Sequence, residues 1–207
     1  MRVLLTAFGP FPGAPFNPTV PLVKALTRRR RPALAGITYA THVFATTYAS
    51  VDRDLPKLLA NRPDIVLMFG LAGRTRHLRV ETRARNALSV LFPDASGYCP
   101  RHNVIKPGGP SSLKGCAPFG RLVSAGRASG FDVRASRDAG RYLCNYAFWR
   151  ALERADNGAP LVQFIHIPLV RSRARRRRPV KRRPAMLRPL VDACETILVA
   201  LVAASRH

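Results

Sequence analysis

Four strand-like runs recur along the chain, and segments with helical periodicity separate them. The runs cover residues 2–8, 36–45, 64–70 and 161–167, and the first, RVLLTAF, is almost entirely apolar before it ends at Gly-Pro. Strands that are apolar along their whole length are typical of a parallel sheet buried on both faces. The alternation of strands and helices predicts an α/β fold: one domain over residues 1–207, a three-layer sandwich with a mixed, mainly parallel sheet flanked by helices.

The remaining segments extend this order. Residues 77–90 alternate apolar and charged, so an extended conformation places Leu78 and Val80 on one face and the charged side chains, Arg79, Glu81, Arg83 and Arg85, on the other. We expect Asn17 to cap the first helix, with Pro18 at the first helical position. Further helices are predicted at 50–61, 117–129, 140–154 and 186–204, a strand at 131–136, and loops at 92–112 and 171–184.

Composition narrows the class of protein. With 207 residues, 47% of them hydrophobic, the chain is long enough to form one domain with a full core. It has no run of about 18 uninterrupted apolar residues, and its N-terminus reaches Gly-Pro too early for a signal-peptide apolar region. We therefore expect a cytoplasmic protein without a membrane partner. Its four cysteines are scattered without metal-binding spacing, which predicts free thiols and no metal site.

The formal net charge of +24 would suit a polyanionic partner. Much of the excess lies in one block, RSRARRRRPVKRRP, at 171–184. No aromatic residue interleaves with these arginines, which disfavours a dedicated nucleic-acid arm without excluding one. We interpret the block as a solvated loop close to the functional end of the strand at 161–167.

Cys144 lies near the start of a predicted helix, in the segment RDAGRYLCNYAFWR. The unpaired N–H groups and the dipole at a helix N-terminus favour a thiolate, which is the form required of a nucleophile. The same residue shares a helical face with Ala147, Phe148 and Ala151, and free cysteine is among the most buried residue types. Periodicity alone favours a core position over a nucleophile.

Two further residues are ambiguous when each is considered alone. His166 ends an apolar strand just before Ile-Pro, where it is either a core histidine or a group at the functional end of the sheet. Glu81 is the one acid on a face with three arginines, where it either forms a surface salt bridge or orients a histidine as an ionised carboxylate.

Taken together, the segments resemble the pyroglutamyl peptidase I family of cysteine peptidases. The resemblance is carried in order by TAFGPFPGAPFNPT, FGLAG, ETRARNALSVLFPD, SRDAGRYLCNY, FIHIP and PAMLRPLVDACETI, which span nearly the whole chain. It implies hydrolysis of an N-terminal pyroglutamyl residue from peptides by a Cys-His-Glu triad. Cys144 matches the nucleophile, His166 the base and Glu81 the acid. Such chemistry requires no metal and no cofactor.

The resemblance also implies a substrate pocket. Phe8 and Phe11 match aromatic residues that wall the lactam pocket in the family, and Asn17 matches its Asn-Pro. Core packing would explain the two phenylalanines equally well, and helix capping would explain Asn17.

Two positions depart from the family pattern. Leu71 stands where the family commonly has Gln before Ala-Gly-Gly-Arg, so pocket polarity differs. Leu91 stands where the family has an Arg before Ile-Pro-Asp-Asn, which removes a charged group suited to stabilising an oxyanion. Both departures predict low pyroglutamyl amidase activity, or a changed specificity.

The sequence leaves two other functions open. One is a hydrolase of the same fold that accepts another small N-terminal acyl group, and the other is a non-catalytic protein that binds nucleic acid or an acidic partner through 171–184. The expected partner is a pyroglutamyl peptide substrate, and the sequence is compatible with a homo-oligomer.

Overall fold

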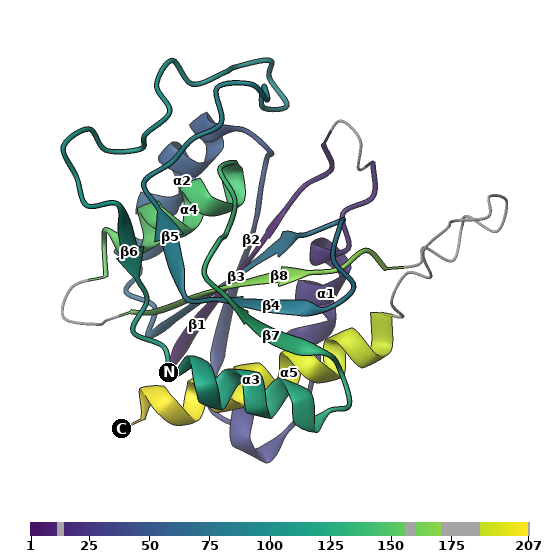
Figure 1. Cartoon of the computed structure of the whole chain (residues 1–207). Helices are drawn as coiled ribbons and strands as arrows, with labels where there is room; N and C mark the ends of the chain where they lie inside the picture. The colour runs from purple at the N-terminus through teal and green to yellow at the C-terminus, as the bar shows by residue number, and fades with distance from the viewer. Residues whose placement is uncertain (12–14, 156–159, 171–186, 207) are drawn as a thin grey trace, which may run out of the picture.

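A six-stranded sheet runs through the middle of the described part of the chain, in the order β2-β1-β3-β8-β4-β7. The computed structural model describes residues 1–11, 15–155, 160–170 and 187–206 (Figure 1). The strands of the sheet are β1 (Arg2–Phe8), β2 (Thr38–Phe44), β3 (Ile65–Leu71), β4 (Leu78–Glu81), β7 (Val133–Ser136) and β8 (Leu161–Ile167).

The sheet is mixed and mostly parallel, as the sequence predicts. β1 pairs in parallel with β2 and β3, and β3 pairs in parallel with β8. β4 runs antiparallel to β8 and parallel to β7. The central strands β1, β3 and β8 are buried along nearly their whole length, which explains why their sequences are continuous apolar runs.

Helices cover both faces of the sheet (Figure 1). One face packs against α1 (Thr19–Leu26), α3 (Phe119–Ala128) and α5 (Leu187–Ser205). The other packs against α2 (Tyr48–Ala60) and α4 (Leu143–Leu152), and a short 3-10 helix, η1, spans Pro32–Leu34. The predicted three-layer α/β class is therefore confirmed.

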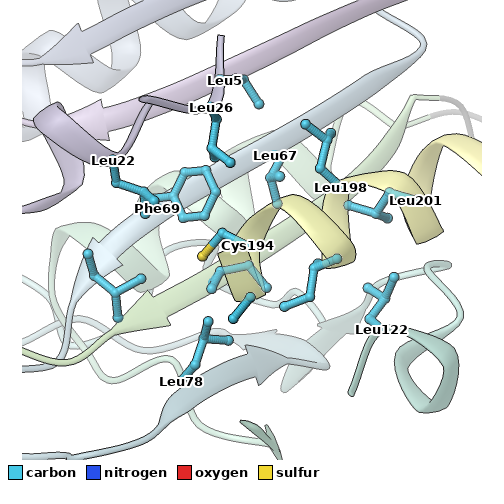
Figure 2. Close-up of a cluster of buried hydrophobic side chains, with 14 of the residues drawn as sticks. Leu5, Leu22, Leu26, Leu67, Phe69, Leu78, Leu122, Cys194, Leu198 and Leu201 are labelled. Atoms are coloured by element: carbon cyan, nitrogen blue, oxygen red, sulfur yellow. The ribbon is translucent and has the colours of Figure 1, made fainter. Parts of the chain in front are cut away.

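A cluster of buried hydrophobic side chains lies between the sheet and α5 (Figure 2). Cys194 of α5 lies in it with Phe69 of β3 and Leu22 of α1, and all three are fully buried. Burial raises the pKa of the Cys194 thiol. All four cysteines lie in the described part of the chain and are free thiols, as predicted.

A second, two-stranded sheet was not expected from the sequence. β5 (Arg83–Arg85) pairs antiparallel with β6 (Ser112–Lys114) in a separate two-stranded sheet, and the long connection between them lies beside α2 and α4 in Figure 1. The alternation at 77–90 predicts β4 correctly, because Leu78 and Val80 are buried in the core under α5. The chain leaves the main sheet at Thr82, so Arg83 and Arg85 lie outside β4.

The basic block predicted as a loop at 171–184 lies outside the described residues. Among the residues that are described, no helix combines the length and the apolar character needed to cross a membrane.

Candidate active site

His166 occupies the centre of the site, near the carboxyl end of β8. In the sheet register it lies opposite Gly70 of β3 on one side and Arg79 of β4 on the other. Its side chain faces the α2 and α4 side with that of Phe164, because residues two apart on a strand share a face, and the two rings are 4.9 Å apart. His166 is 5% exposed, so its ring nitrogens depend on protein partners.

Glu81 is the partner of one ring nitrogen. Nδ1 of His166 donates to Oε1 of Glu81, and the two atoms are 2.8 Å apart. Because β4 runs antiparallel to β8, Glu81 pairs in register with Phe164 and reaches His166 diagonally. The Glu81 side chain is completely buried, so the pair is shielded from water.

Cys144 reaches the same histidine from α4, where it is the second residue of the helix. A hydrogen bond joins the thiol to His166, and since Nδ1 is bonded to Glu81, Nε2 is the nitrogen that remains for it. The helix begins three residues later than the sequence predicts. Gly140, in the preceding turn, has a φ of 87°, which is outside the helical region and easily adopted by glycine. This turn delivers Cys144 to the first turn of α4.

Burial, Cys144 and Glu81 together set the charge of His166. Burial alone lowers the pKa of the imidazole, but the charge and hydrogen bond of Cys144, together with Glu81, raise it from 6.5 to about 9. The imidazolium is therefore favoured at neutral pH. A histidine held between a thiol and a carboxylate is the arrangement that activates cysteine nucleophiles.

Gly70 makes room for the thiol, and sequence reasoning missed it. A Cβ at this position would lie 2.7 Å from Sγ of Cys144 and 2.8 Å from the ring of Phe164. A glycine among bulky residues in a buried strand indicates that another group approaches the backbone closely. This was the signal in the sequence that could have identified Gly70. No side chain fits at this position without moving the sulfur or the ring.

Asn145 is a second residue that sequence reasoning missed. It is fully buried, and its Oδ1 accepts the N–H of Arg85 at 2.8 Å. Its Nδ2 donates to the carbonyls of Arg85 at 2.8 Å and Ala87 at 3.0 Å. The residue next to Cys144 therefore fastens the start of α4 to the segment that follows β4. In the sequence, Asn145 is marked only by its position directly after Cys144 in LCNY.

The predicted pocket residues lie at the same end of the sheet. Phe8 is the last residue of β1, is 3% exposed, and its ring centroid is 5.6 Å from that of Phe44. Phe11 follows three residues later and is half-buried. Phe8 thus packs into the hydrophobic core between the sheet and helices α2 and α4.

Asn17 fastens the connection between β1 and α1. Its Nδ2 donates to the carbonyl of Gly9, and its Oδ1 accepts the N–H of Thr19, both at 3.1 Å. The helix begins at Thr19 with Pro18 as its N-cap, so the predicted capping position is wrong by one residue. Asn17 still accepts an N–H group from the first turn, because that turn lacks intrahelical acceptors.

The two departures from the family pattern occupy different settings. Leu71 ends β3, where it pairs with Ile167 and is half-buried. Leu91 lies on the long connection and is 78% exposed. Flanking residues tie that segment to the approach to α4: Ser89 donates to the carbonyl of Arg141, and the hydroxyl of Tyr142 donates to that of Pro93.

Comparison with known proteins identifies the family of the chain. The sequence matches the model of the pyroglutamyl peptidase family over residues 1–207. A pyrrolidone-carboxylate peptidase of Thermococcus onnurineus is 32% identical over 202 residues, which cover 96% of this chain and 97% of that protein.

Solved structures give the same result. The pyrrolidone carboxyl peptidase from Thermus thermophilus has a TM-score of 0.84 and 30% identity, covering 95% of this chain and 98% of its own. The corresponding peptidase from Thermococcus litoralis has a TM-score of 0.87 and 26% identity, with 99% and 95% covered. The chain therefore belongs to the pyroglutamyl peptidase family and is a cysteine-type omega peptidase.

Proposed function

We propose that this protein, as one peptidase domain over residues 1–207, removes an N-terminal pyroglutamyl residue from peptides with a Cys144, His166 and Glu81 triad. The observation that carries the proposal is the continuous chain of hydrogen bonds from the Cys144 thiol through the His166 ring to the buried Glu81 carboxylate. Family membership supports the substrate class.

The first half of the reaction forms a thioester. The Cys144 thiolate attacks the carbonyl carbon of the pyroglutamyl residue, and the carbonyl oxygen takes the negative charge of a tetrahedral intermediate. The imidazolium of His166 then donates its Nε2 proton to the leaving nitrogen as the carbon–nitrogen bond breaks. The shortened peptide leaves with a free amino group.

The second half restores the enzyme. Neutral His166 accepts a proton from water, and the resulting hydroxide attacks the thioester carbon. Collapse of this intermediate breaks the carbon–sulfur bond, releases pyroglutamate and returns the thiolate beside the imidazolium. Glu81 keeps Nδ1–H of His166 oriented through both halves and stabilises its positive charge.

Backbone groups at the start of α4 are suited to the oxyanion. The first N–H groups of a helix have no intrahelical acceptor, and Cys144 is the second residue of α4. Its own N–H therefore accompanies its thiol into the site. With Leu91 in place of an arginine, these neutral donors carry more of the stabilisation than a charged group would.

The pyroglutamyl ring is assigned to the region of Phe8, Phe11, Asn17 and Leu71. Flat aromatic rings suit a small apolar lactam, and Leu71 can pack against the ring carbons. The leucine side chain cannot bond the lactam amide, so recognition of that amide falls to backbone groups.

Triad variants test the proposal with a pyroglutamyl fluorogenic amide. Cys144→Ala and His166→Ala should abolish turnover, and Glu81→Gln should reduce kcat while leaving a folded protein, since it alters orientation and charge around His166. Cys116→Ala, at an exposed cysteine, is the matched control and should retain activity. Turnover by Cys144→Ala at the wild-type rate would refute the assignment.

A further inference from the structure

Arg79 contacts the acid of the proposed triad, Glu81, from the same strand, β4. Building on the function proposed above, we propose that Arg79 is a positioning residue that holds the Glu81 carboxylate in the orientation and ionisation state that His166 requires. It acts through Glu81, so it is not itself a catalytic residue.

The geometry gives one oxygen two partners. Nε of Arg79 lies 3.1 Å from Oε1 of Glu81, the same atom that accepts Nδ1–H of His166 at 2.8 Å. Arg79 is also the register partner of His166 across β4 and β8. Residues 79 and 81 project from the same face of their strand, which brings both side chains to the histidine.

The guanidinium is itself anchored. Its Nη2 donates to Oγ of Ser136 at 2.6 Å and to the backbone carbonyl of Asp138. Ser136 ends β7, and Asp138 begins the turn that leads through Gly140 to Cys144. Arg79 therefore joins the acid of the triad to the segment that delivers its nucleophile, with donors fixed in a planar fork.

Glu81 depends on this contact because it is buried. Its side chain is completely shielded, and within the described part of the chain its Oε2 has no hydrogen-bond partner. A buried carboxylate needs a paired cation or hydrogen bonds to remain ionised. The charged groups next to Glu81 are His166 of β8 and Arg79 of its own strand. Asp138 lies at the far end of the Arg79 guanidinium, and its carboxylate is 3.4 Å from Arg85.

The neighbouring strand supplies a matched control. Arg134 of β7 is the register partner of Arg79, but it pairs with Asp132 and both of these side chains are more than half exposed. Exposed pairs of this kind contribute little. An effect specific to Arg79 should therefore be absent from the same substitution at Arg134.

The first test compares Arg79→Gln and Arg79→Met with Arg134→Gln. Both Arg79 variants remove the guanidinium charge and keep much of the aliphatic side chain. Either variant, if it folds, therefore tests whether the charge of Arg79 is needed. We expect kcat for a pyroglutamyl fluorogenic amide to fall about 10- to 100-fold, with KM little changed. The acid limb of the kcat/KM profile should move to higher pH, because removing a cation 3.1 Å from the Glu81 carboxylate weakens the negative partner that stabilises the imidazolium of His166. Arg79→Lys, which keeps the charge, should restore the position of the acid limb.

A second readout separates this proposal from the proposed function. The rate of iodoacetamide alkylation of Cys144 against pH reports the thiolate and needs no peptide substrate. In Arg79→Gln or Arg79→Met the rise of this rate should occur at higher pH than in wild type and in Arg134→Gln. If the wild-type protein fails to cleave pyroglutamyl amides, the proposed function fails and the alkylation curve still tests Arg79. Superimposable alkylation curves, or a loss of kcat with an unmoved acid limb, would overturn the proposal.

Discussion

Gly70 lies against Cys144 so closely that a Cβ on the glycine would be 2.7 Å from the cysteine sulfur. The rigid strand β3 thereby sets where the thiol sits relative to His166, the register partner of Gly70. The position of the Cys144 thiol thus depends on the absence of a side chain at residue 70, on a strand that precedes α4 by four other strands in the sequence.

Substituting Gly70 with Ala should impair the reaction more than the fold. The added methyl must displace Sγ of Cys144 or the Phe164 ring, so we expect a loss of kcat of at least about 10-fold and a destabilisation of about 1–3 kcal/mol. Kinetics and urea unfolding measure the two effects. Gly73→Ala is the control, because a Cβ there would be 3.7 Å from Leu169, an ordinary contact. Full activity of Gly70→Ala would contradict the tight fit.

The histidine pKa predicts a pH-dependent contribution to stability. His166 titrates at about 9 in the folded protein instead of 6.5, so it binds a proton that the unfolded chain has lost between these values. Its stabilisation is complete below pH 6.5 and lost as the pH rises through about 9, at most about 3 kcal/mol.

Urea unfolding of wild type and His166→Gln tests this contribution. The difference between their free energies of unfolding should shrink between pH 6.5 and 9. His77→Gln serves as the control: burial lowers the pKa of His77, so both of its states are neutral over this range and the difference should stay constant. A constant difference for His166→Gln would show that folding does not raise the pKa of His166.

Restoring a cation at position 91 should raise the rate. Leu91 is 78% exposed on a segment tied to the approach to α4, so an arginine fits there without disturbing the core. An oxyanion donor is worth about 100- to 1,000-fold in turnover, and we expect Leu91→Arg to recover at least about 10-fold in kcat. Val43→Arg adds the same charge at an exposed residue of β2 and should have no such effect. Equal rates for the two variants would show that a cation at position 91 does not stabilise the oxyanion.

Asn145 should be necessary for stability as well as for placing the nucleophile. Asn145→Asp keeps the shape and the acceptor for Arg85 N–H, but it turns a carboxylate oxygen toward the carbonyls of Arg85 and Ala87. We expect a loss of about 2–4 kcal/mol in urea unfolding. Asn103→Asp, exposed on the long connection, should stay within about 0.5 kcal/mol of wild type, and a similar result for Asn145→Asp would argue against the network.

The fold was largely predictable because its signals are local. Apolar runs identify β1, β3 and β8, and the alternation at 77–90 identifies β4 and its buried face. The separate sheet of β5 and β6 was missed because the alternation at 77–90 continues past the point where the chain leaves the main sheet, and because the three residues of β6 are too few to show a period. The start of α4 was misplaced because the positive φ of Gly140 depends on the turn that surrounds it.

The site was less accessible to local reasoning. Periodicity alone favours a core role for Cys144, and only the resemblance of whole segments favours a nucleophile. Gly70 and Asn145 depend on the register between distant segments, which no single stretch of sequence reveals. Arg79 was visible as one of three arginines on the Glu81 face, yet only the antiparallel pairing of β4 with β8 distinguishes it from Arg83 and Arg85.

The proposed pyroglutamyl peptidase activity of Cys144 is tested most directly by one measurement. It is the hydrolysis of a pyroglutamyl fluorogenic amide beside its prolyl analogue, before and after stoichiometric alkylation of Cys144. We expect low but measurable turnover of the pyroglutamyl amide, slower turnover of the prolyl amide, and loss of both when one thiol per chain, that of Cys144, is blocked. A folded protein that cleaves no pyroglutamyl substrate, or that keeps its activity with Cys144 fully alkylated, would contradict the proposed activity.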